Sequence, residues 1–228
     1  SIASGHGSRD TITEMARAAA KASLTALGIS DHAPASPGSA GSSYFRSLRL
    51  ADRKLFGVNL LYGVELNILN ENGDVDLEDE LIRSLDYAFI SMHHPVFAGG
   101  DADSNTTAYI NAMKHPGVRF LGHPDDGRFP VDYERLLDAC VKYQVYPEIN
   151  NASLAPDAYR TDGQRNCLEI LSLCKKKNLP VLLSSDSHGR AHIGDMSYIF
   201  PLLEECSFPP QLVINSDTGL FYRVLGSS

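Results

Sequence analysis

The chain has 228 residues, of which 43% are hydrophobic and 21% charged, the composition of an ordinary globular protein. Its formal net charge of −8 disfavours non-specific binding to nucleic acid or anionic lipid, which requires basic surface. No apolar run approaches the roughly 18 residues that cross a bilayer. These features argue against a membrane protein and against a protein that clamps long nucleic acid.

Short β-rich apolar segments alternate along the chain with longer segments of helical periodicity. The spacing predicts helices over residues 10–26, 44–56, 77–84, 105–114, 132–143, 162–177 and 196–205. It predicts strands over residues 27–32, 60–68, 87–93, 119–123, 146–150 and 181–185. Strands that alternate with helices indicate βαβ units and a parallel sheet. We find no linker between two cores, so we expect one domain over residues 1–228.

Two segments read as long loops, residues 33–43, which are rich in Pro, Gly and Ser, and residues 94–104. We expect the first of them to be exposed and mobile. The four cysteines form no C-x-x-C pair and lie mostly among apolar neighbours. They predict buried free thiols in a reducing compartment, and hence a cytoplasmic protein. The four are Cys140, Cys167, Cys174 and Cys206.

Each of the six expected strands finishes in polar residues of the kinds that bind metal ions. In a parallel β/α barrel the strand ends meet at one face, where active sites lie. Buried imidazoles and carboxylates packed together without a cation would cost several kcal/mol. Imidazole and carboxylate without thiolate suit Zn, Mn or Fe. We therefore expect two or three divalent ions, with Zn favoured, held by strand-end residues that include His32, Glu65, His93, His123, Asp186 and His188.

The order of these motifs resembles the polymerase and histidinol phosphatase (PHP) superfamily, most closely its stand-alone bacterial phosphatase branch. The similar segments are Ala3-Ser4-Gly5-His6, Ile29-Ser30-Asp31-His32, Gly63-Val64-Glu65-Leu66-Asn67, His93-His94-Pro95-Val96-Phe97, Gly122-His123-Pro124, Glu148-Ile149-Asn150-Asn151 and Ser185-Asp186-Ser187-His188. The resemblance implies an α/β fold, a distorted β/α (TIM-like) barrel of seven strands. It also implies a metal-dependent hydrolase of phosphoric ester bonds.

The resemblance further implies a role for each candidate ligand. Glu65 corresponds to a carboxylate that bridges two metals, and His93 and His123 to ligands of the second. Asp186 corresponds to a ligand of the first metal. We choose His93 over His94 because the family's ligand lies two residues before a proline, and we expect His94 to face the substrate. The third metal's ligands correspond to His6, His32 and His188.

The family opens with a strand that ends in a His-x-His motif, and this chain begins just after the equivalent point. Loss of that strand would expose two strand edges. We therefore expect that the sequence omits the strand rather than that the protein lacks it. A true absence would weaken the first metal site.

A phosphate ester would gain from an arginine near the metals, because a guanidinium matches phosphate oxygens. Arg49, after the first long loop, is our first candidate and Arg160 our second, whereas we expect His115 and His192 to lie outside the site. The catalytic residues we expect are Glu65, Asp186, His94 and Arg49.

The predicted function is metal-dependent hydrolysis of small phosphate monoesters by a metal-activated hydroxide. The alternatives are a histidinol phosphatase, a phosphodiesterase or nuclease of the same superfamily, and a metal-binding module with impaired catalysis. The expected partner is a small phosphorylated substrate, with no membrane and no long nucleic acid. Self-association into a homo-oligomer stays open.

Overall fold

The computed structural model describes residues 8–226 of the chain. Its centre is a seven-stranded sheet in the order β1-β3-β4-β5-β6-β7, with β2 paired to β3. All pairings are parallel except that of β2 with β3, as the alternating pattern predicts. The strands are β1 (Ala26–His32), β2 (Lys54–Leu55), β3 (Val58–Asn67), β4 (Tyr87–Ser91), β5 (Val118–Leu121), β6 (Tyr146–Asn150) and β7 (Leu182–Ser184).

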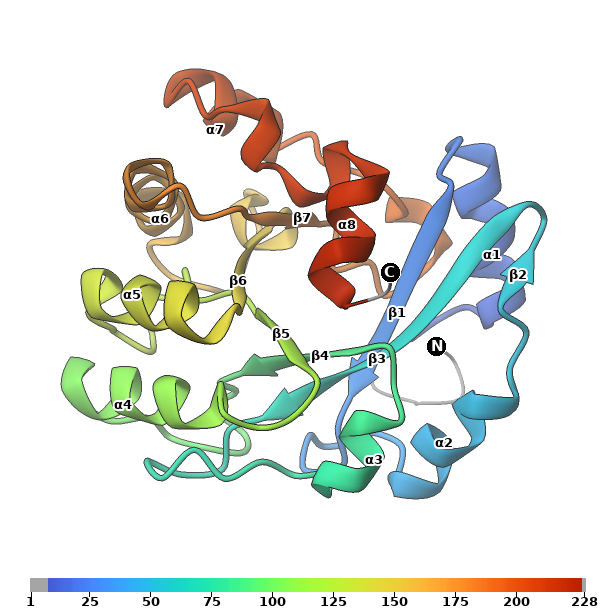
Figure 1. The fold of residues 1–228 in the computed structure, drawn as a ribbon, viewed down its shortest axis with the longest axis horizontal. Helices are drawn as coiled ribbons and strands as arrows, with labels where there is room; N and C mark the ends of the chain where they lie inside the picture. Colours follow the sequence, from blue (N-terminus) through green and yellow to red (C-terminus); the bar gives the residue numbers. More distant parts are fainter. Residues whose placement is uncertain (1–7, 227–228) are drawn as a thin grey trace.

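Helices cover the outside of this curled sheet (Figure 1). The α-helices are α1 (Ile12–Lys21), α2 (Ser42–Ser47), α3 (Asp79–Arg83), α4 (Ala102–Ala112), α5 (Tyr133–Tyr143), α6 (Gly163–Lys177), α7 (Ile199–Glu205) and α8 (Thr218–Leu225). Short 3-10 turns occur at Leu48–Leu50, Ala152–Leu154, Arg190–His192, Pro210–Leu212 and Ile214–Ser216. No helix within residues 8–226 is both long and apolar enough to span a membrane.

Side-chain caps set where several helices begin. Thr11 accepts a hydrogen bond from the Glu14 backbone, and the Glu14 side chain accepts one in return from the Thr11 backbone. This capping box satisfies two amide groups at the start of α1. Asp132 caps α5 through the backbone of Arg135, as expected from its position before an apolar periodic run.

The helix predicted over residues 44–56 is wrong beyond its first turns. The helical segment ends with the 3-10 turn at Leu50, and Lys54–Leu55 forms β2 instead. Phe56 and Gly57 both have positive φ, 51° and 85°, as a tight hairpin turn between β2 and β3 requires. Apolar residues spaced like a helix therefore enter an edge strand, because Gly57, immediately before β3, permits the turn. The short α8 was not predicted from the sequence either.

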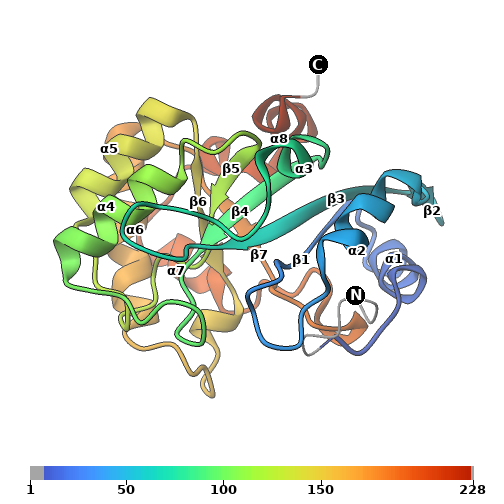
Figure 2. The same cartoon turned by 90° about the horizontal axis from the view of Figure 1, so that it is seen from below.

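Two apolar cores flank the sheet. The larger one packs the outer face of the strands against helices such as α4, α5 and α6, which line one side of the sheet in Figure 2. The smaller one fills part of the inner face with the rings of Tyr87, Phe89 and Phe120, and α8 packs onto it through Val224 and Leu225. Three of the four free cysteines belong to the outer core, as predicted, whereas Cys206 is half-buried. Burial raises the pKa of the Cys140 and Cys167 thiols.

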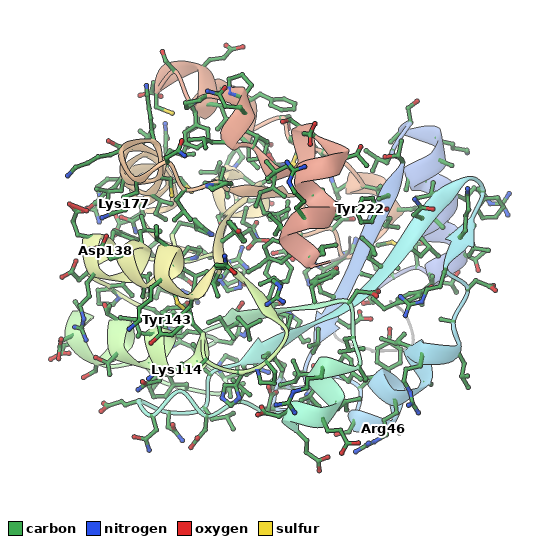
Figure 3. All side chains as sticks on the ribbon, in the orientation of Figure 1. Arg46, Lys114, Asp138, Tyr143, Lys177 and Tyr222 are labelled. Atoms are coloured by element: carbon green, nitrogen blue, oxygen red, sulfur yellow. The ribbon has the colours of Figure 1, made fainter. Side chains whose placement is uncertain are left out.

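Charged side chains cover the outward faces of the helices. Lys177 of α6 and Asp138 of α5 lie on facing helices and form a salt bridge, and both are marked in Figure 3. The buried face of each helix is apolar by contrast, with Leu136, Leu137 and Cys140 on α5. This division agrees with a surface that carries the net negative charge.

The sheet curls but does not close within the described residues, because β1 and β7 lie at its two ends. Both edge strands line one cavity of about 640 Å³ that runs inside the curl. The architecture is thus a parallel half-barrel with helices outside, which matches the predicted distorted TIM-like barrel. The polar end of the cavity contains the strand-end residues described next.

Candidate metal centre

Successive strands bring the predicted ligands to one end of the half-barrel. The parallel register of β1 and β3 pairs His32 with Glu65. His93, His123 and Asp186 each lie two residues beyond the last residue of β4, β5 and β7. Because the carboxyl ends of parallel strands point the same way, residues far apart in the sequence converge here. His123 and Asp186 both have positive φ, 29° and 48°, a conformation that is costly for these residues and that clusters at functional sites.

The carboxylate of Glu65 is the centre of the cluster. Its Oε2 lies 3.2 Å from His32 Nδ1, while its Oε1 lies 3.3 Å from His93 Nε2 and 3.0 Å from His123 Nε2. The ligand atoms of His32, Glu65 and His93 lie within 4.8 Å of one another, close enough to hold one ion. The two oxygens therefore face different histidines, an arrangement that a carboxylate shared between two ions requires.

The surroundings of Glu65 favour its ionised form. Burial opposes ionisation, but the imidazoles of His32 and His93 and a hydrogen bond from His123 outweigh it and hold the pKa of Glu65 well below its usual range. Burial, helped by the positive charge of Arg160, lowers the pKa of His123 to about 4. His123 is consequently neutral near pH 7, the form in which imidazole binds metals.

One contact in this cluster lacks a proton whenever the His93 ring is neutral. His93 Nδ1 lies 2.8 Å from Asn67 Oδ1, an amide oxygen that only accepts hydrogen bonds, so Nδ1 carries the hydrogen. In the neutral ring, Nε2 then presents a lone pair to the Glu65 carboxylate. This Nε2 atom is buried, and no hydrogen bond reaches it from residues 8–226. Two acceptors that face each other are unfavourable unless a cation lies between them, so the residues fit a bound metal ion.

Asp186 approaches the cluster from the other edge of the sheet. Its Oδ2 accepts hydrogen bonds from Arg160, at 3.2 Å, and from Asn150 Nδ2, at 3.1 Å. Burial raises the pKa of Asp186, but the charge of Arg160 outweighs this effect and lowers it overall. His188 lies on the exposed rim, with its Nδ1 3.8 Å from Asp186 Oδ1 and its ring 6.4 Å from that of His32.

Glu148, on β6, is a buried acid of the site that we did not single out from the sequence. Its Oε2 accepts a hydrogen bond from the His123 backbone N–H at 2.7 Å, and its Oε1 accepts one from the Ser184 hydroxyl. Burial and the nearby charge of Asp186 raise the pKa of Glu148 to about 7. Asp125 is also fully buried, and burial raises its pKa to about 6. Glu148 lies in one of the segments that carry the family resemblance, but we assigned it no role, and Asp125 lies in no motif that we singled out.

The structure separates other predicted residues from this cluster. Arg49 is exposed in the 3-10 turn after α2 and donates through Nε to the Arg46 carbonyl at 3.3 Å. His94 is exposed and lies 4.6 Å from the Phe129 ring, centre to centre. His115 binds Asp79 and the Gly73 carbonyl, and His192 is exposed near Asp195, both apart from the cluster. His6 lies outside the described residues.

Of the two arginine candidates, Arg160 lies in the site. Its side chain is only 5% exposed. It donates to Asp186 and to the Ser153 hydroxyl, whereas its buried Nε–H finds no acceptor in the described part of the chain. Arg160 is therefore buried beside a candidate ligand, whereas Arg49 is exposed. The sequence showed each only as a basic residue after a loop, which says nothing of burial.

Several curated proteins are similar to this chain over almost its full length, although no family model matches it. A probable phosphatase of Clostridium novyi is 34% identical over 216 residues, which cover 95% of this chain and 87% of that protein. A probable phosphatase of Caldicellulosiruptor bescii is 35% identical over 98% of this chain and 92% of that protein. One of Caldanaerobacter subterraneus subsp. tengcongensis is 37% identical over 94% and 84%.

Two solved structures share the fold. Histidinol phosphate phosphatase of Lactococcus lactis, in complex with Zn, L-histidinol and phosphate, superposes with a TM-score of 0.63 at 15% identity, over 92% of each chain. A chain of an archaeal ribonuclease P structure with mature tRNA superposes with a TM-score of 0.61 at 15% identity, over 96% of this chain and 88% of that one. At such low identity these likenesses establish the architecture alone.

Fold, strand-end cluster and relatives together define an enzyme that hydrolyses phosphoric ester bonds, a phosphatase. Within that class, the chain belongs to the PHP-type phosphatases. The resemblance drawn from the motifs is thereby confirmed.

Proposed function

We propose that this phosphatase is metal-dependent and that it hydrolyses small phosphate monoesters. The observation that carries the proposal is the Glu65 carboxylate, which lies within 3.3 Å of nitrogens from three histidines. When His93 is neutral, its Nε2 lone pair faces a carboxylate oxygen of Glu65, and the two acceptors repel each other. A cation between them would attract both groups. The Zn in the Lactococcus lactis neighbour supports the same reading.

Two or three divalent ions would be held by strand-end residues from both edges of the sheet. Zn is favoured over Mn and Fe, since the donors are imidazoles and carboxylates without thiolate. When bound, such ions lower the pKa of water and neutralise charge on phosphoryl oxygens. The residues that would hold them are His32, Glu65, His93, His123, Asp186 and His188, with His6 as a further ligand expected from the sequence.

Arg160 is the residue that would orient the phosphoryl group. Its planar guanidinium suits phosphate oxygens, and Asp186 and Ser153 hold it in a fixed direction at the site. A side chain ordered before the substrate arrives loses little entropy on binding. We expect a minor role for Arg49, which is exposed, and keep His94 as a residue that contacts the alcohol part of the substrate.

Small monoesters suit this surface better than long nucleic acid does. The chain carries a net charge of −8, so a polyanion would be repelled outside the site. A single phosphate needs only the local positive charge of Arg160 and the bound ions. A histidinol phosphatase is the second candidate, because the Lactococcus lactis neighbour holds histidinol and phosphate.

The direct test is hydrolysis of p-nitrophenyl phosphate by purified protein. Activity should disappear after chelation and return when Zn²⁺ or Mn²⁺ is restored. Histidinol phosphate, bis(p-nitrophenyl) phosphate and a short single-stranded oligonucleotide would be compared in the same assay. Turnover that survives complete chelation would refute metal dependence, and faster cleavage of the diester or oligonucleotide would refute monoester specificity.

Metal content provides a second test that needs no turnover. Glu65→Ala should lose most of the bound metal, because it removes a donor shared between ions and a single ligand change typically costs at least 10-fold in affinity. Arg49→Ala changes an exposed side chain that is not a candidate ligand, and it should retain the wild-type content by elemental analysis. Equal metal content in Glu65→Ala and wild type would contradict the role of Glu65.

A further inference from the structure

Asp76 connects three groups around the end of β3. It follows a tight hairpin in which Ile68 bridges Val75, so the chain folds back beside the strand end. Its Oδ1 accepts from the Asn67 backbone N–H at 2.8 Å. Its Oδ2 accepts from Asn67 Nδ2 at 2.6 Å and from the Ala35 backbone N–H at 2.8 Å. Asp76 thus ties the loop after β1 to the last residue of β3, and this part of the loop is fastened rather than free.

These contacts leave the buried amide of Asn67 only one orientation. Its Nδ2 faces Asp76 Oδ2 and, at 3.3 Å, the Ala33 carbonyl, both of which can only accept hydrogen bonds. Its Oδ1 consequently points the other way. There it accepts from the Ser36 hydroxyl at 2.9 Å and from His93 Nδ1 at 2.8 Å. A flipped amide would place its oxygen against two acceptors, Asp76 Oδ2 and the Ala33 carbonyl.

We propose that Asp76 is a positioning residue, which acts through Asn67 to hold His93 in the tautomer with hydrogen on Nδ1 and a lone pair on Nε2. That lone pair is the one that faces Glu65. A metal-binding histidine commonly has its tautomer fixed by the hydrogen bond of its other nitrogen. Here the acceptor is itself oriented by a carboxylate one step further out. Only the consequence for metal affinity rests on the proposed function, whereas the tautomer does not.

Asp76→Asn is nearly isosteric and tests this chain of contacts. The new amide has one oxygen for two positions. The Oδ1 position accepts from the Asn67 backbone N–H, and the Oδ2 position accepts from Asn67 Nδ2 and from the Ala35 backbone N–H. In molecules whose NH₂ takes the Oδ2 position, Asn67 Nδ2 loses its carboxylate acceptor. Asn67 Nδ2 would then meet another donor, so the Asn67 amide should flip. Its Nδ2 would face His93 Nδ1, and His93 should move its hydrogen to Nε2.

Asp74→Asn is the matched control. Asp74 belongs to the same hairpin, and its carboxylate accepts from Asn70 Nδ2 at 2.8 Å without contacting Asn67. Both variants make the same chemical change and remove the same charge. A difference between them therefore reports the contact with Asn67 and not the loss of a negative charge.

The measurement is two-bond ¹H–¹⁵N correlation NMR of histidine side chains in metal-free protein that carries Glu65→Ala, which removes the acceptor facing His93 Nε2. Spectra are recorded at about pH 8.5, well above the ordinary histidine pKa of about 6.5. His93 is assigned by the signal lost in His93→Asn. In this Glu65→Ala background we expect the Nδ1–H tautomer with Asp76 intact and with Asp74→Asn, and a measurable population of the Nε2–H tautomer with Asp76→Asn. An Nε2–H tautomer with Asp76 intact, or no Nε2–H population in folded Asp76→Asn, would overturn the proposal. If Asp76→Asn does not fold, the spectrum with Asp76 intact still decides.

Zn²⁺ affinity, measured by competition with a chromophoric chelator, separates this proposal from the proposed function. Asp76→Asn should bind Zn²⁺ about 10- to 100-fold more weakly than wild type, and Asp74→Asn equally well. If the tautomer changes in Asp76→Asn but the wild type binds no Zn²⁺, the metal site is refuted and the positioning role of Asp76 is still supported. Unchanged affinity in an Asp76→Asn protein that does bind Zn²⁺ would refute the link from tautomer to metal.

Discussion

Individual acids in the candidate site differ in protonation because their neighbours differ. Glu65 contacts imidazoles and stays ionised, whereas Glu148 lies deeper, beside the charge of Asp186, and its pKa rises to about 7. Two carboxylates in one cluster thus behave in opposite ways. The first is suited to bind cations, and the second to hold the His123 backbone in its strained conformation.

The raised pKa of Glu148 predicts a pH dependence of folding stability. The pKa of Glu148 is 4.5 in the unfolded chain and about 7 in the folded protein. Its protonated form therefore stabilises the folded state fully at pH values below 4.5, and this stabilisation is lost as the pH rises through about 7. Relative to Glu148→Gln, the metal-free wild type should lose about 3 kcal/mol of unfolding free energy across this interval. Urea denaturation at a series of pH values measures the difference, and parallel curves for the two proteins would contradict it.

At the scale of elements, the pattern of apolar runs predicts the six parallel strands and their polar ends. It does so because a strand buried on both faces reads as a short apolar run, and each run here is followed by ligand-type residues. The pattern fails where a turn decides the outcome, at Phe56 and Gly57, since spacing does not reveal that two positive φ values redirect the chain. It also misses Asp76 and Glu148, whose roles depend on contacts that only folding creates.

The packing of β4 against β3 depends on a glycine, Gly63, which leaves room for the ring of Tyr87. A Cβ atom at Gly63 would lie 2.4 Å from the ring of Tyr87, too close for any real contact. Gly63→Ala should destabilise the protein by about 1–3 kcal/mol through overpacking. The cost should nearly vanish in a Tyr87→Ala background, which a double-mutant cycle of unfolding free energies measures. An equal cost in both backgrounds would show that Tyr87 is not the obstacle.

For the whole molecule, binding of the proposed ions should raise thermal stability. A ligand at 100 times its dissociation constant adds about 2.7 kcal/mol, which corresponds to roughly 5–10 °C for a domain of this size. Scanning calorimetry of the metal-free protein, before and after addition of Zn²⁺, measures the shift in Tm. Glu65→Ala should show a much smaller one, and an unchanged Tm in wild type would contradict the site.

The position of the cluster across the unclosed sheet has a mechanical consequence. His32 is the last residue of β1, and Asp186 follows β7. Between these two edge strands no ladder hydrogen bond forms in residues 8–226. Ions bound by both residues would cross-link the two edge strands. Removal of the metal should then increase local opening between β1 and β7 as well as stop turnover. Limited proteolysis of the metal-free enzyme should therefore cut first near these two strands.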